Sequence, residues 1–200
     1  MNKTSESMSK TQKLTLLALL TAIVVVLQLL GSFIRFGGFS VSLVLVPIVL
    51  GAAILGVGAG AWLGLVFGVT VLVSGDAAAF FSINAVGTVV TVLGKGVLAG
   101  LAAGAVYKLL EKKSVLAATI AAAVVCPVVN TGIFFLGCVT FFIKAISEIA
   151  AGQGQNVFAF IIFVYIGGNF LFELLFNVVL APVILRLVAV AKKMIERKKQ

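Results

Sequence analysis

The sequence predicts an all-α integral membrane protein with six transmembrane helices. Of its 200 residues, 62% are hydrophobic and only 10% are charged, and the mean hydropathy is +1.27. A soluble domain carries about 25% charged residues. This chain therefore has too few polar groups to cover its apolar surface in water, and lipid is the solvent that we expect around it.

The positions of the basic residues predict the topology. Of the 15 Lys and Arg residues, 12 lie in the N-terminal segment, in the turn at 108–113 or in the C-terminal stretch from Arg186 onward, and Arg35 and Lys144 lie in the opposite loops. Six spans place both termini on one side, and the positive-inside rule assigns that side to the cytoplasm. The net charge of +9 then reflects topology and contacts with lipid headgroups, and no nucleic-acid partner is expected.

The first half of the chain predicts three spans. Residues 14–31 form an apolar segment that no A-x-A-like cleavage site follows, so we expect a retained helix and not a signal peptide. No charge occurs over the 40 residues 36–75. One helix of that length would measure about 60 Å, twice the hydrocarbon thickness. The segment must fold back, and the glycine-rich residues 56–60 predict a hairpin of two helices at about 40–55 and 59–74.

The second half predicts three further spans, at about 86–107, at 115–142 and from about 157 onward. Residues 75–84 are expected to form a loop or an interfacial segment, and residues 144–156 a polar loop. In terms of domains, the sequence predicts a cytoplasmic tail at 1–13, one six-helix membrane domain at 14–190, and a basic cytoplasmic tail at 191–200.

Small residues recur every fourth position on two of these helices, a spacing that lets helix backbones approach closely. We expect the longer stripes to pack within the monomer; they comprise Gly56, Gly60, Gly64, Gly68 and Gly96, Gly100, Gly104. A shorter patch, Ala18 and Ala22, lies on the first span. It is compatible with packing inside the chain or with contact to another protein.

Lys95 is the one basic residue inside a predicted span. It lies in Leu93-Gly-Lys95-Gly-Val97, roughly 12 Å from the outer end of its helix. A lysine at the bilayer centre costs about 2.5–3.5 kcal/mol on insertion scales. That cost is tolerable where the ammonium faces a wet cavity and meets an anion, so Lys95 predicts a polar pocket.

Other polar residues occur at comparable depth. Asn130 follows Pro127 by three residues in the fifth span, and Asn169, Glu173 and Asn177 share one face of the sixth helix. Two alternatives stay open. In one, Lys95 pairs with Glu173. In the other, which we favour, Lys95 holds a carboxylate or similar anion of a small solute while Asn130 and Asn169 orient it. In the loop before the fourth span, four residues are lid candidates or plain interfacial residues: Asp76, Phe80, Phe81 and Asn84.

Several kinds of chemistry lack their residues. The chain has no histidine, and its two cysteines, Cys126 and Cys138, fall in one apolar stretch. A metal site of the usual His/Cys kinds is therefore not expected. The sequence around Lys95 lacks the spacing and the hydroxyl of a phosphate-binding G-x-x-x-x-G-K-[ST] loop. The sequence thus predicts no enzyme, but a binding subunit that draws its energy from partners.

Over about residues 12–190 the chain resembles the substrate-binding S components of energy-coupling factor (ECF) transporters. Six spans, the basic N-terminus and Ala18-Leu-Leu-Thr-Ala22 carry this resemblance. Within the family it is most similar to the pantothenate-type subgroup. That similarity lies in residues 44–56, in residues 60–68, and in Val128-Val-Asn130-Thr131-Gly132.

The resemblance implies partners and roles. Ala18 and Ala22 match the element with which S components dock on the transmembrane T subunit, which works with two ATPase subunits. Asn130 matches a ligand-binding asparagine, and Lys95 stands where the subgroup commonly has an arginine. Since arginine binds carboxylate bidentately and lysine is a point charge, this departure leaves another vitamin-like anion open. The chain itself is expected to hold no cofactor, because the ATPase subunits use the ATP.

We therefore expect a multi-pass protein of a prokaryotic cell membrane that captures pantothenate, or a similar small carboxylate vitamin or precursor, outside the cell for import. Its predicted substrate-binding residues are Lys95, Asn130, Asn169, Asn84 and Glu173. Two alternatives stay open. In the first, the chain is an autonomous secondary transporter of a small organic anion, with Glu173 as its proton site. In the second, it is a structural membrane protein without a ligand.

Overall fold

The computed structural model describes residues 8–33, 35–36, 39–40 and 43–197. In these residues the chain is a helical bundle, and five of its helical segments are long and apolar enough to cross a membrane. A sixth apolar helix, α3, is shorter. The main helices are α2 (Lys10–Phe33), α3 (Leu45–Leu55), α4 (Val57–Ser74), α6 (Ala85–Leu110), α7 (Val115–Gly137) and α10 (Gly167–Arg197). The prediction of a helical membrane bundle is confirmed.

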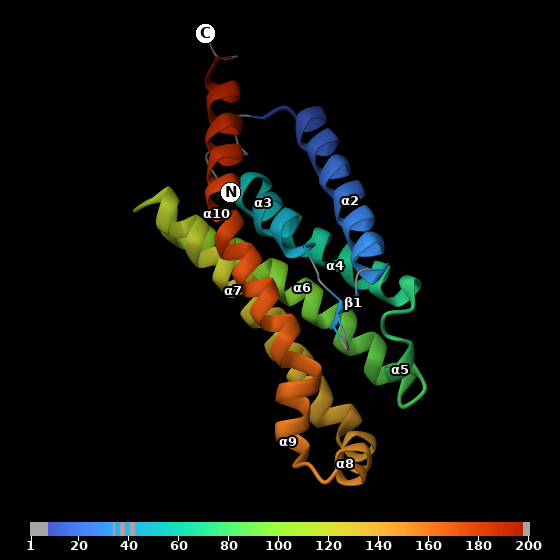
Figure 1. Cartoon of the computed structure of the whole chain (residues 1–200). Helices are drawn as coiled ribbons and strands as arrows, with labels where there is room; N and C mark the ends of the chain where they lie inside the picture. Colours follow the sequence, from blue (N-terminus) through green and yellow to red (C-terminus); the bar gives the residue numbers. More distant parts are fainter. Residues whose placement is uncertain (1–7, 34, 37–38, 41–42, 198–200) are drawn as a thin grey trace.

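Shorter elements connect these helices. A strand pair, β1 (Arg35–Phe36) and β2 (Phe39–Ser40), is an antiparallel addition that the all-α prediction did not include. The remaining elements are α5 (Ala78–Phe81), the π-helical η1 (Cys138–Phe142), α8 (Ile143–Gly152), α9 (Val157–Phe160) and the π-helical η2 (Ile161–Ile166). Figure 1 shows α5, α8 and α9 at the end of the bundle opposite the first turn of α2 and the last turns of α10.

Helix α2 begins with a capping box. The Gln12 backbone N–H donates to Ser9 Oγ at 3.2 Å, and the Ser9 backbone N–H donates to Gln12 Oε1 at 3.0 Å. This reciprocal pair satisfies two donors that a helix start leaves without partners. One face of α2 is then buried along Leu20, Val24 and Gln28, at four-residue spacing.

The predicted break between the second and third spans is a single residue. Gly56 has φ of 102°, a left-handed region that glycine enters without steric cost. The chain folds back there and packs α3 against α4. A Cβ built on Gly51 would overlap the Leu63 side chain, and a Cβ built on Gly60 would lie 2.9 Å from the Cβ of Ala52. The hairpin is confirmed, but its break is narrower than predicted, since residues 57–60 already belong to α4.

The glycine stripes pack α4 against α6. A Cβ on Gly64 would overlap the carbonyl oxygen of Gly96, and a Cβ on Gly100 would overlap that of Gly60. Side chains at these positions would therefore push the two backbones apart. The expectation that the long stripes pack within the monomer is confirmed for six of the seven glycines, whereas a Cβ on Gly56 would meet nothing within 4 Å.

The expected polar loop at 144–156 is largely helical. Helix α7 continues through η1 into α8, which ends at Gly152. The reason is a four-residue spacing of apolar side chains, since Phe142, Ile146 and Ala150 are all buried. An amphipathic pattern of this kind stabilises a helix whose other face is polar.

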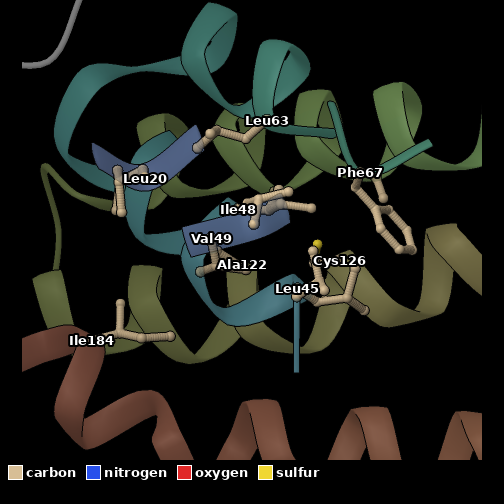
Figure 2. Close-up of a cluster of buried hydrophobic side chains, with 14 of the residues drawn as sticks. Leu20, Leu45, Ile48, Val49, Leu63, Phe67, Ala122, Cys126 and Ile184 are labelled. Atoms are coloured by element: carbon tan, nitrogen blue, oxygen red, sulfur yellow. The ribbon is translucent and has the colours of Figure 1, made fainter. Parts of the chain in front are cut away.

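The apolar core forms two clusters. The main cluster joins α2, α3, α4, α6, α7 and α10 through interleaved apolar side chains. Figure 2 shows Leu20, Leu45, Ile48, Val49, Leu63, Phe67, Ala122, Cys126 and Ile184. The second cluster lies around η1, α8 and η2 and contains Cys138, Phe142, Ile146, Ala150, Phe160 and Ile161. The polar cavity described next borders both.

Candidate functional site

A cavity of about 170 Å³ lies within the helical bundle. It is bordered by α2, α4, α6, α7, η2 and α10, and by the segment that leads into α5. Its charged and polar lining residues are Gln28, Asp76, Lys95, Asn130, Thr131, Tyr165, Asn169 and Glu173. Apolar residues complete the wall, including Phe67, Phe80 and Phe134. Drug-sized ligand sites measure about 300–1,000 Å³, so this cavity suits a small solute.

The ammonium of Lys95 lies between two aromatic rings. Its Nζ is 5.3 Å from the ring centroid of Phe67 on α4 and 5.5 Å from that of Phe134 on α7. Cation–π attraction over this range is favourable, and it partly offsets the loss of water around the charge. Among the described residues, Lys95 has no hydrogen-bonding or ion-pairing acceptor.

Glu173 is the buried carboxylate of the cavity, with 2% of its surface exposed. Asn130 Nδ2 donates to Oε2 at 3.3 Å across the α7–α10 interface, and Asn169 Nδ2 donates to Oε1 at 3.1 Å from one turn earlier on α10. Asn177 Nδ2 donates to the backbone carbonyl of Glu173 at 2.8 Å. Two asparagines thus bind the Glu173 carboxylate, and a third binds its backbone.

Lys95 and Glu173 share the cavity without direct contact. Each exerts an electrostatic attraction on the other, but within the described part of the chain the side-chain partners of the carboxylate are the two amides. An ion pair between Lys95 and Glu173, which was one of the two alternatives, is therefore not formed among the described residues. Asn130 and Asn169 bind the carboxylate instead, while Asn177 binds the backbone carbonyl of Glu173.

A second hydrogen-bonded acid, Asp76, lies in the cavity wall just before α5. Asp76 Oδ2 accepts from Gln28 Nε2 at 2.7 Å and from Ser32 Oγ at 2.6 Å. These bonds join the end of α2 to the segment that leads into α5. Because Gln28 and Asp76 both line the cavity, this contact forms part of its wall.

Aromatic side chains pack beside Asp76. The Phe80 ring lies 5.5 Å from that of Phe134, 5.0 Å from Phe142 and 5.6 Å from Tyr165, measured between centroids. Phe142 ends η1 and Tyr165 lies in η2. Such short π-helical stretches occur frequently at functional sites, where they change the direction of side chains.

Four of the five predicted substrate-binding residues meet at this cavity: Lys95, Asn130, Asn169 and Glu173. Asn84 does not line it. The Asn84 side chain accepts from the Gly87 backbone N–H at 2.8 Å and caps the start of α6. Of the lid candidates, Asp76 and Phe80 line the cavity, whereas Phe81 is exposed.

Among the lining residues that were not predicted as part of the site are Gln28, Phe67, Phe134 and Tyr165. Two carried a signal. Gln28 is a long polar side chain inside an apolar first span, and Tyr165 precedes Asn169 and Glu173 at four-residue spacing on the same face. The two phenylalanines carried none, because an aromatic residue in an apolar helix is as often packed in a core or against lipid.

Ala18 and Ala22 lie on the outward face of α2, where both are exposed. Beside them the Trp62 indole N–H donates to Thr21 Oγ1 at 3.1 Å, and Trp62 itself is 48% exposed. The small-residue patch of α2 therefore stays uncovered by the rest of the described chain.

A bundle of membrane-spanning helices around a small polar cavity with one ammonium group defines a membrane-embedded solute-binding protein. The profile of the family described as "ECF transporter, substrate-specific component" matches residues 12–185. The chain belongs to this family. A search of curated proteins finds no match.

Membership in this family gives the general function of the chain. It is the substrate-binding subunit of an ECF importer, a multi-pass membrane protein and a transport subunit. The family also implies partnership with a T subunit and ATPase subunits.

Proposed function

We propose that this S component binds pantothenate, or a similar small carboxylate vitamin or precursor, with Lys95 as the anion-binding residue. The supporting observation is a difference between the charged groups of the cavity. Glu173 and Asp76 each accept two side-chain hydrogen bonds, while the protein supplies Lys95 with two aromatic faces and, among the described residues, no acceptor. Three ammonium donors are thus available to a solute.

The proposed transport cycle uses the two ends of the molecule. Both termini are cytoplasmic, and the solute enters from the outer side, where Asp76 and Phe80 border the cavity. The subunit then docks on the T subunit through Ala18 and Ala22. ATP hydrolysis in the two ATPase subunits drives a reorientation in the prokaryotic cell membrane that releases the solute inside.

The test of binding is a thermal-shift measurement on the detergent-purified chain with pantothenate, followed by other water-soluble vitamins. A solute at 100 times its dissociation constant stabilises by about 2.7 kcal/mol, which is a readable shift. Lys95→Met should abolish the shift. Lys108→Met is the matched control, because Lys108 is an exposed lysine on the same helix. An unchanged shift in Lys95→Met would refute the assignment of Lys95.

Docking is tested separately from binding. Ala22→Leu adds bulk to the exposed patch of α2 and should prevent co-purification with the T and ATPase subunits, while the pantothenate shift stays intact. Ala105→Leu, at an exposed alanine of α6, is the control. Complex formation by Ala22→Leu at the wild-type level would place the docking surface elsewhere.

A further inference from the structure

We infer that Glu173 is a positioning residue, which orients Asn130 and Asn169 so that their amide oxygens accept hydrogen bonds from hydroxyl or amide N–H groups of the solute. This inference rests on the proposed function, because it names further chemistry of the solute that Lys95 binds. It assigns to Glu173 a role other than contact with the solute or with Lys95.

The two hydrogen bonds to the Glu173 carboxylate have a fixed direction. Ionised carboxylates only accept hydrogen bonds, and Glu173 accepts from Nδ2 of Asn130 at 3.3 Å and of Asn169 at 3.1 Å. If either amide were rotated by half a turn, its oxygen would face the carboxylate and the two acceptors would repel. The carboxylate therefore selects one orientation of each asparagine.

This orientation leaves the amide oxygens of the two asparagines without partners among the described residues. Asn130 Oδ1 and Asn169 Oδ1 are both buried, and neither has a hydrogen-bond partner in the described chain. Buried acceptors without partners are rare in folded proteins, and each calls for an explanation. Both residues line the cavity that also contains Lys95. Neither oxygen has appreciable surface accessible from the cavity as the structure stands, so a donor on a solute bound there would satisfy these oxygens after a small displacement of the neighbouring side chains.

These groups together indicate the kind of solute that the site accepts. Lys95 on α6 offers donors to an anion, while Asn130 on α7 and Asn169 on α10 offer acceptors. The site thus favours a small molecule with an anionic group and with hydroxyl or amide N–H groups along its length. An acid without such donors would leave both amide oxygens unpaired, and sites that hydrogen-bond a substrate hydroxyl strongly reject analogues that lack it.

The test uses pantothenate and its two monodeoxy analogues, in each of which one hydroxyl is replaced by hydrogen. Dissociation constants are measured by calorimetry on the full chain in detergent. For the wild type, at least one analogue should bind about ten- to a hundredfold more weakly than pantothenate, as expected for loss of a hydrogen bond to a buried acceptor. In Glu173→Gln the side chain can also donate, which releases the asparagines to rotate, and the ratio should fall to about threefold or less.

Two further variants separate positioning from structure and from charge. Asn177→Ala removes the bond to the Glu173 backbone carbonyl at a buried position outside the cavity lining. It should lower the melting temperature and keep the wild-type ratio. Glu173→Asp keeps the charge but withdraws the carboxylate by one methylene, so it should lose the ratio as Glu173→Gln does. It also serves if the glutamine variant does not fold.

The outcomes are distinguishable. A wild type that binds pantothenate without discrimination against either analogue would overturn the inference alone, as would a wild-type ratio in both Glu173 variants. A wild type that binds no pantothenate would overturn the proposed function with this solute, and the inference with it. Loss of the ratio in the Glu173 variants but not in Asn177→Ala would establish the positioning role.

Discussion

The α4–α6 and α7–α10 interfaces are built from opposite materials. Between α4 and α6 the backbones touch at glycines, so that even a methyl group on Gly64 has no space. Between α7 and α10 the buried contact includes a hydrogen bond from Asn130 to Glu173, with unpartnered amide oxygens beside it. Close-packed backbones resist displacement, whereas polar groups with unfilled bonding capacity gain from a partner. The first interface is scaffold and the second is suited to binding.

Lys95 stands where these two interfaces come together. Its neighbour Gly96 packs on Gly64, which holds α6 at a fixed distance from α4 and from the ring of Phe67. The rest of the cavity wall comes from α7 and α10. A solute that bridges Lys95 and the asparagines would therefore connect a rigid wall to a more adjustable one.

The strongest way to break this comparison is Gly64→Leu. The new side chain would collide with the backbone of Gly96 across the α4–α6 interface, and overpacking of this kind costs about 3 kcal/mol. Thermal melting in detergent should show a large loss of stability. Gly132→Leu is the control, since a Cβ at Gly132 meets nothing within 4 Å. Equal melting temperatures for the two variants would show that α4 and α6 are not in backbone contact.

A smaller loss is expected at the second interface. Asn130→Leu removes one donor to the Glu173 carboxylate, and leaving a buried acceptor short of a partner costs about 1–3 kcal/mol. Thermal melting should show this loss. Val128→Leu, at an exposed position on the same helix, should melt like the wild type. If Asn130→Leu is as stable as that control, the hydrogen bond across α7 and α10 contributes nothing to the fold.

The sequence predicted the scaffold better than the site, for a physical reason. The structure predicted from the four-residue glycine spacing and from the uncharged stretch around Gly56 follows from helix geometry and bilayer thickness, which constrain any membrane chain in the same way. Lys95 and Glu173 were found because charges in lipid are costly. Their separation was not predictable, because it depends on the packing of α7 on α10, which brings the Asn130 amide to the carboxylate.

A local hydrogen bond gives Asn84 a structural role that the sequence did not predict. Asn84 is polar and lies next to an apolar span, as a ligand contact would, but it immediately precedes α6 and is a favoured residue for a helix start. The α8 segment shows the same limit from the other side. Its polar residues predicted a loop, while the buried face along Phe142, Ile146 and Ala150 fixed a helix.

The smallest expected effect sharpens the boundary of the site at Asn84. Its Oδ1 accepts from the Gly87 backbone N–H, so Asn84→Ala should cost about 1 kcal/mol of stability, the usual value for a lost cap. Ser114→Ala is the matched control, because Ser114 caps α7 through the Ala117 backbone N–H at 3.2 Å and lies far from the cavity lining. Both variants should melt lower by similar amounts, and Asn84→Ser should recover most of the loss.

The affinity for pantothenate decides between a cap and a ligand contact. The side-chain oxygen of Asn84 already accepts a hydrogen bond from its own helix. We therefore expect Asn84→Ala and Ser114→Ala to bind pantothenate as the wild type does. Lys95→Met should not bind it. A selective loss of affinity in Asn84→Ala, with Asn84→Ser failing to restore it, would extend the site to the start of α6. The adjustable region would then include the N-terminal end of α6, and the contrast with the α4–α6 scaffold would hold only for the C-terminal half of that helix.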